Sequence, residues 1–138
     1  MLINRRHVKL FALEMAKARA HKFTRVSQEF FLKCEANLKE FIERIRRDMG
    51  EVPVFYIASK PCPSRWAMWD KINRVNEDLR AYAKEKPKVF YIDITKVMLD
   101  KDGKPNPGLF QLDRLHMNRK GQEMWIPIVK QAIEAAVR

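Results

Sequence analysis

Asp113 and His116 are the two residues of this chain whose types and spacing could carry out proton-transfer chemistry. They lie in the stretch Phe110-Gln-Leu-Asp-Arg-Leu-His-Met-Asn-Arg-Lys-Gly121, in the order D-x-x-H. A carboxylate three residues before an imidazole can orient the ring, fix its tautomer and stabilise the imidazolium that forms when the ring takes a proton. The pair therefore predicts the general-base half of a hydrolase that uses a nucleophilic side chain.

A bare D-x-x-H arises often by chance, and it also fits a solvated loop acid and a histidine packed near a helix start. The surrounding residues make the pattern more specific, because the stretch Leu112–Asn118 is followed by Gly121 and then by Trp125. This block resembles the last motif of the SGNH/GDSL esterase and lipase family, which reads roughly D-x-L-H-x-N-x-x-G-x-x-x-W. The resemblance extends back through Tyr56–Trp66 and Tyr91–Ile94, and it covers about the last two thirds of the chain.

The resemblance implies a three-layer, flavodoxin-like α/β domain that hydrolyses carboxylic esters through an acyl-enzyme, without a metal or another cofactor. It implies that His116 is the general base and that Asp113 is its orienting partner. In the family, the nucleophilic serine lies in a G-D-S motif, and a later G-x-N-D motif supplies a side-chain donor to the oxyanion. This sequence has no G-D-S, and Met15 falls on the Asn of G-x-N-D, so neither contribution transfers to this chain.

Three short apolar runs are expected to form the strands that position these residues. Those near 52–58 and 89–94 are rich in β-branched and aromatic residues, which is typical of buried parallel strands. The run near 8–13 is placed by the resemblance, because its periodicity does not decide between a strand and a helix. Apolar residues at three- and four-residue steps predict helices over 27–48, from a cap at Ser64 to about 86, and after a cap at Asn118. This alternation predicts an α/β fold with a parallel sheet covered by helices.

The strand near 8–13 corresponds, by the resemblance, to the third strand of the family, so the first two strands are missing. We therefore expect a single, incomplete domain over residues 1–138 that is truncated at its front, or a gene fragment whose other part supplies the serine. Missing strands would leave a hydrophobic sheet edge without a partner. We expect such an edge to favour a homo-oligomer joined through strands, or poor solubility.

The loops that follow the strands are expected to form a cleft beside His116, because ligands of parallel sheets gather at the carboxyl ends of the strands. Glu14, Ser59 and Arg65 lie in these loops and are the candidate cleft residues. Arg65 could approach an anionic group, although a surface or capping role is the commoner use of such an arginine. Ser59 or Cys62 could replace the missing nucleophile, but the prolines on both sides of Cys62 indicate a loop held for its shape.

The charge and the cysteine content of the chain limit which partners and which cellular compartment we expect. The chain has 138 residues and a formal net charge of +11, which favours attraction to nucleic acid or anionic membranes. The basic residues are spread without a dense cluster, so we do not expect a nucleic-acid-binding function. The two cysteines lack further metal-ligand pairs, which argues against a zinc site and fits a reducing, cytoplasmic compartment. The apolar stretch near the N-terminus is broken by charges and too short to span a bilayer.

The sequence leaves two functional hypotheses from different classes. The first is a GDSL-type hydrolase of a small ester substrate, weak or inactive alone because a recognisable nucleophile is missing. The second is a non-catalytic, basic binding or scaffold module for an anionic partner. Turnover of a short-chain p-nitrophenyl ester would distinguish the first hypothesis from the second.

Overall fold

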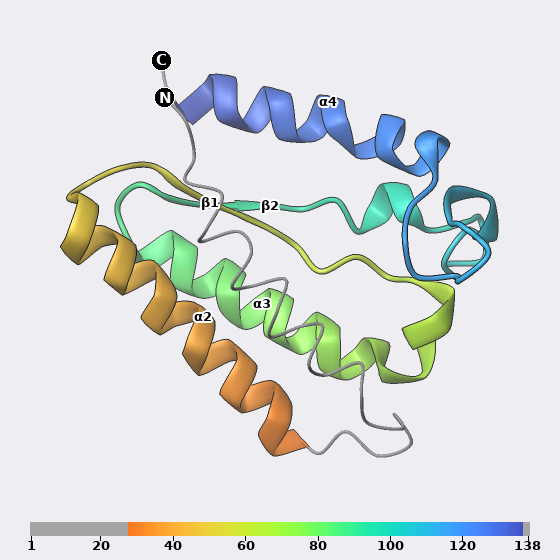
Figure 1. The fold of residues 1–138 in the computed structure, drawn as a ribbon, viewed down its shortest axis with the longest axis horizontal. Helices are drawn as coiled ribbons and strands as arrows, with labels where there is room; N and C mark the ends of the chain where they lie inside the picture. The colour runs from red at the N-terminus through yellow and green to blue at the C-terminus, as the bar shows by residue number, and fades with distance from the viewer. Residues whose placement is uncertain (1–27, 137–138) are drawn as a thin grey trace.

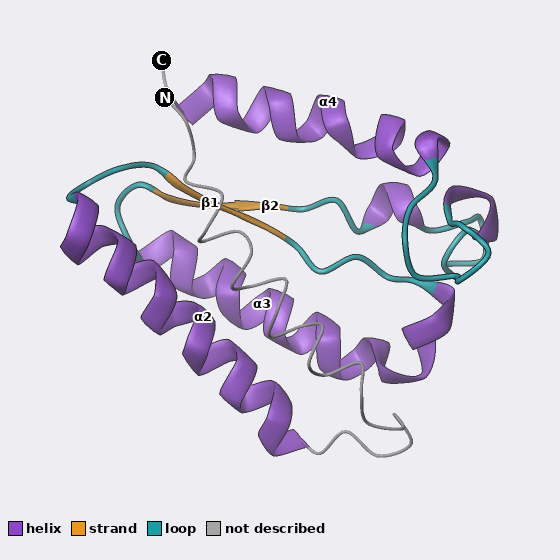
Figure 2. Ribbon diagram, in the orientation of Figure 1, coloured by secondary structure: helices purple, strands orange, loops and turns teal. Residues whose placement is uncertain are grey.

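The computed structural model describes residues 28–136, and this part of the chain folds into three long helices around a two-stranded parallel sheet (Figures 1 and 2). In chain order, the elements are α2 (Gln28–Met49), β1 (Val54–Ile57), α3 (Trp69–Glu85), β2 (Val89–Ile92) and α4 (Arg119–Ala136). The loops contain the short 3-10 helices η1 (Pro63–Met68), η2 (Lys96–Met98) and η3 (Pro107–Leu109). None of the helices in the described part is long and apolar enough to cross a membrane.

The two strands have the same sequence, Val-Phe-Tyr-Ile, and they pair so that like residues lie opposite each other. The paired residues are Val54 with Val89, Phe55 with Phe90, Tyr56 with Tyr91 and Ile57 with Ile92. The two phenylalanine rings stack with their centroids 5.0 Å apart. Within the described residues, β1 has no strand beside its other edge, so the expected strand-mediated self-association stays a prediction.

The sheet lies between α4 on one side and the α2–α3 pair on the other (Figure 1). Side chains alternate along a strand, so the face that carries Val54 and Tyr91 packs against the helix pair. There a buried cluster forms from Ile42 of α2, Ala83 of α3 and Val89 of β2. Helix α3 is the crossover that a parallel pair of strands requires, and it places the carboxyl ends of β1 and β2 at one edge.

The structure confirms the strands predicted near 52–58 and 89–94, and it shortens both of them. β1 begins at Val54, after Pro53, which has no amide to donate to the ladder. β2 ends at Ile92, after which the Asp93 carboxylate accepts the amide of Thr95 and turns the chain. The strand predicted near 8–13 lies outside the described residues.

The predicted helix starts hold for α4 and fail for α3. Ser64 lies inside η1, and neither η1 nor α3 has a side-chain hydrogen bond at its cap. The cap prediction was wrong because Pro63, which suits the first position of a helix, starts the 3-10 turn earlier and leaves Cys62 at the cap. Asn118 does cap α4, since its Oδ1 accepts the Gly121 amide at 3.0 Å.

The first turn of α4 approaches the backbone of η3 closely. Gly121 is buried, and a methyl group at this position would lie 2.2 Å from the Leu109 carbonyl oxygen. Asn118 stabilises the same contact. Its backbone amide donates to the Leu109 carbonyl, and its side-chain Nδ2 donates to the carbonyls of Gly108 and Phe110. The approach of helix to loop therefore requires glycine at position 121.

Replacing Gly121 with Ala tests this close approach, because two effects oppose each other. Helix propensity alone would stabilise the alanine variant by about 1 kcal/mol. Overpacking costs about 1–3 kcal/mol, and the obstructing atom is a backbone oxygen that cannot rotate away. We expect net destabilisation in urea unfolding, with Gln122→Ala at the exposed neighbouring position as the control that changes little. A Gly121→Ala variant more stable than wild type would contradict this close packing.

Candidate active site

Asp113 and His116 lie in the loop between η3 and α4, and the structure brings their side chains together. Asp113 Oδ2 forms a hydrogen bond with His116 Nδ1, and Asp113 Oδ1 accepts the backbone amides of Leu115 and His116, both at 2.9 Å. The bonds from His116 and Leu115 hold the pKa of Asp113 well below its ordinary value. The carboxylate therefore stays ionised, and it fixes the imidazole through Nδ1, so that proton exchange would take place at Nε2.

Backbone hydrogen bonds close the base loop, residues 111–118, into a tight turn. The Gln111 amide donates to the His116 carbonyl at 2.7 Å, and the Arg114 amide donates to the Gln111 carbonyl at 2.9 Å. Arg114 takes a φ of 57°, a left-handed conformation that costs a residue with a side chain about 1–2 kcal/mol. The loop keeps this strained residue between the acid and the base because the bonds around it leave the backbone little alternative.

A second loop, residues 59–65 after β1, packs against the base loop and is called the β1 loop below. The Ser64 amide donates to the Arg114 carbonyl at 3.1 Å. Cys62 is buried in an apolar cluster with Met98, Leu109 and Phe110, against which Val97, Leu115 and Met117 pack. The end of β1 and the candidate base therefore lie together, although they are far apart in sequence.

Ser59, a candidate cleft residue, is held at the end of β1 by a buried amide of α3. Asn76 Nδ2 donates to the Ser59 carbonyl, and Asn76 Oδ1 accepts the Ser59 amide, both at 2.9 Å. The Ser59 hydroxyl lies 3.5 Å from the hydroxyl of Tyr56. The sequence reasoning missed Asn76, which is 0% exposed. The signal that could have revealed it is an amide on the apolar stripe of α3, between Val75 and Leu79.

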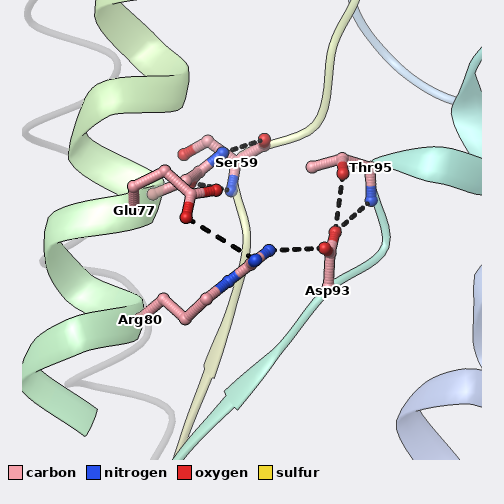
Figure 3. Close-up of polar contacts among 6 residues, drawn as sticks. Ser59, Glu77, Arg80, Asp93 and Thr95 are labelled. Carbon is pink, nitrogen blue, oxygen red and sulfur yellow. Dashed lines mark hydrogen bonds and ion pairs between the residues drawn. The ribbon is translucent and has the colours of Figure 1, made fainter. Parts of the chain in front are cut away.

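A charged network ties α3 to the end of β2, close to Ser59 (Figure 3). Arg80 Nη2 binds Asp93 Oδ2 at 2.6 Å, and its Nη1 lies 3.5 Å from a carboxylate oxygen of Glu77. Burial alone would raise the pKa of Asp93, but hydrogen bonds from the Thr95 hydroxyl and amide, with the charge of Arg80, bring it below the ordinary value. Asp93 therefore stays charged, and its contacts hold the chain where it leaves the sheet.

The remaining candidate residues are placed differently. Arg65 is half-buried in η1, and Glu14 lies outside the described residues. Cys62 is 4% exposed within the apolar cluster, and its Sγ lies 3.8 Å from Ser64 Oγ, which fits packing better than a reactive thiolate. The described residues thus hold an acid and a base together, and they do not identify a nucleophile.

An acid–histidine pair beside the carboxyl end of a parallel strand is the base arrangement of hydrolases that use a nucleophilic side chain. A sequence profile of the GDSL-like Lipase/Acylhydrolase family matches residues 14–124, and the chain belongs to this family. No curated protein matches this sequence significantly.

Solved structures share part of the fold. A candidate acylhydrolase from Bacteroides fragilis is 23% identical, covers 78% of this chain and superposes with a TM-score of 0.66. A candidate platelet activating factor from Streptococcus pneumonia is 17% identical, covers 73% of this chain and gives a TM-score of 0.64. The chain spans about half the length of these proteins, 53% of the first and 50% of the second.

Replacing Asn76 with Ala should loosen the end of β1. The change removes the two hydrogen bonds to the Ser59 backbone and a longer one, of 3.5 Å, from the Tyr56 hydroxyl, so the amide and carbonyl of Ser59 lose their partner and we expect a loss of about 2–3 kcal/mol in unfolding free energy. Urea unfolding measures this loss. Asn37→Ala, at an exposed position of α2, is the matched control. Equal stability of the two variants would show that the buried amide contributes nothing to this contact.

Replacing Asp113 with Asn should make the thermal stability depend differently on pH. The pKa of Asp113 is depressed in the folded chain, so its stabilising effect is present above the ordinary carboxyl value, about pH 4, and is lost as the pH falls below it. We expect wild type to melt above Asp113→Asn at neutral pH, with a gap that closes toward low pH. Asp102→Asn in an exposed loop should show no such gap, and a gap independent of pH would contradict the assignment.

Proposed function

We propose that this chain carries the general-base part of a carboxylic-ester hydrolase, with His116 as the base and Asp113 as the residue that orients it. The observation that supports this most directly is the hydrogen bond between Asp113 and His116 Nδ1, inside the segment that matches the acylhydrolase family. In this proposal the domain is an incomplete, three-layer, flavodoxin-like member of the family. Its substrate is a small ester.

In the proposed reaction, His116 Nε2 takes the proton of an attacking hydroxyl as its oxygen adds to the ester carbon. The imidazolium then gives this proton to the departing alcohol, and the same ring later activates the water that releases the acid. Asp113 stays ionised throughout because its pKa is well below the ordinary value, and it stabilises the positive ring. General acid–base catalysis of this kind contributes about 10²–10⁴-fold to a rate.

The attacking hydroxyl in this proposal comes from a segment outside the sequence. The sequence has no G-D-S motif, and the side chains of Ser59 and Cys62 lie against Tyr56 and the apolar cluster respectively. Since the chain spans about half the length of the solved structures it resembles, a partner segment has room to supply a serine and the oxyanion donors. The isolated chain is accordingly a weak catalyst.

The isolated chain should hydrolyse p-nitrophenyl acetate slowly, with a water molecule that His116 activates as general base in place of the missing hydroxyl, so this turnover should depend on His116. We expect His116→Ala to lower the rate to that of the uncatalysed reaction, and Asp113→Asn to lower it about 10-fold through loss of ring orientation. Release of p-nitrophenolate measures both rates.

Two further variants make this assay decisive. Gln122→Ala, on an exposed position of α4, should keep the wild-type rate. Loss of turnover in Ser59→Ala as well as in His116→Ala would make Ser59 the nucleophile and replace the proposed partner segment. Equal rates in wild type and His116→Ala would remove the base function altogether.

The charge of the chain favours a second candidate function, a non-catalytic module that binds an anionic partner. The formal net charge is +11, and attraction of this origin weakens steeply as salt rises. Salt-sensitive binding to heparin, in a chain with no His116-dependent turnover, would favour this second function over the first.

A further inference from the structure

Lys60 lies in the β1 loop, and the fold holds its backbone on both sides. Asn76 binds the amide and carbonyl of Ser59 before it, and Pro61 after it is fully buried. Cys62 then anchors the loop in the apolar cluster. The side chain of Lys60 is half-buried. The fold thus keeps the backbone of Lys60 near the carboxyl end of β1, where ligands of parallel sheets bind.

The β1 loop brings Lys60 within electrostatic reach of the base. Ser64 of this loop is bonded to the Arg114 carbonyl, between Asp113 and His116 in the chain. Burial, and to a smaller extent the charge of Arg65, lowers the pKa of Lys60, and these effects exceed the opposing effects of Cys62 and Asp113. Asp113 already accepts bonds from the His116 ring and from two backbone amides. Asp113 is therefore engaged mainly by the base loop.

The rim formed by the two loops carries an excess of positive charge. Residues 59–65 and 111–118 contain a single acid, Asp113, and three residues with a permanent positive charge, which are Lys60, Arg65 and Arg114. Arg119 and Lys120 follow in the first turn of α4, where Arg119 is paired with Glu123 at 2.9 Å. A neutral ester would gain little from this rim. An anion would be attracted by it, and at the half-buried Lys60 it would meet a cation in a medium of lower dielectric constant than water.

We propose that the ester taken by this site carries a second, anionic group of the carboxylate kind, and that Lys60 binds this group. Arg65, on the same loop, adds attraction for it. This inference rests on the proposed role of His116 and names the substrate class for that role. Lys60 is here a specificity-determining residue, since it recognises a charge on the substrate and takes no part in proton transfer.

Binding of two matched esters to the full chain tests the proposal. Monomethyl succinate carries an ester and a carboxylate, whereas dimethyl succinate carries the ester without the charge. We expect monomethyl succinate to shift the NMR signals of the His116 ring and of the β1 loop saturably, and to bind at least about 5-fold more tightly than dimethyl succinate. Lys60→Gln should weaken binding of monomethyl succinate about 5- to 10-fold and leave that of dimethyl succinate unchanged.

The control is Lys33→Gln, which removes the same charge from an exposed position of α2 and should leave the affinity unchanged. Thermal melting shows whether Lys60→Gln is folded. If Lys60→Gln does not fold, Lys60→Met, which keeps the apolar stem of the side chain, replaces it in the comparison of the two esters. Equal binding of the two esters by wild type would overturn the proposal. So would a Lys60 variant that binds monomethyl succinate as tightly as wild type.

These experiments test the base function of His116 and the anion site at Lys60 independently. Charge-dependent binding in a chain without His116-dependent turnover would support the anion site and contradict the ester chemistry alone. His116-dependent turnover with equal binding of the charged and neutral esters would contradict the anion site alone.

Discussion

The arrangement of the candidate site depends on the hydrogen bonds made by one carboxylate, that of Asp113. One of its oxygens engages the ring of His116, and the other accepts two backbone amides of the same loop. The same acid therefore shapes the turn and orients the imidazole. Because all of these contacts span three residues or fewer, the pair can form without help from the sheet. The sheet has a different role, because it places the β1 loop beside the Asp113–His116 pair.

Close packing between segments far apart in the chain holds the β1 loop against the base loop. Cys62 joins the β1 loop to the base loop through the apolar cluster, and the Ser64 amide adds a hydrogen bond to Arg114. Asn76 fixes the point at which β1 ends, and Gly121 lets α4 start against the backbone of η3. These contacts leave the two loops little freedom relative to each other, which is what a binding site with a fixed charge distribution requires.

Membership of the GDSL-like acylhydrolase family gives the acid–histidine pair a chemical context. The positive charge of the rim adds a preference for anionic ligands. The base is accompanied by basic side chains rather than by a recognisable nucleophile in the same sequence. Both candidate functions draw on this rim, because an anionic ester and an anionic macromolecule are attracted by the same field. They differ in whether His116 exchanges a proton, which is a property of the ring and not of the surrounding charge.

The sequence by itself determined the features that depend on neighbouring residues: the Asp113–His116 pair, the two apolar strands and the cap at Asn118. It was wrong at Ser64, where the preference of Pro63 for the start of a helix prevailed. Tertiary structure alone decided that Asn76 holds Ser59, that Leu109 excludes a side chain at position 121, and that the loop of Lys60 is hydrogen-bonded to the base loop. The reason is that a local pattern determines hydrogen bonds and periodicity within one segment. These three contacts join segments that are adjacent only in the folded chain, in which α3 connects β1 to β2.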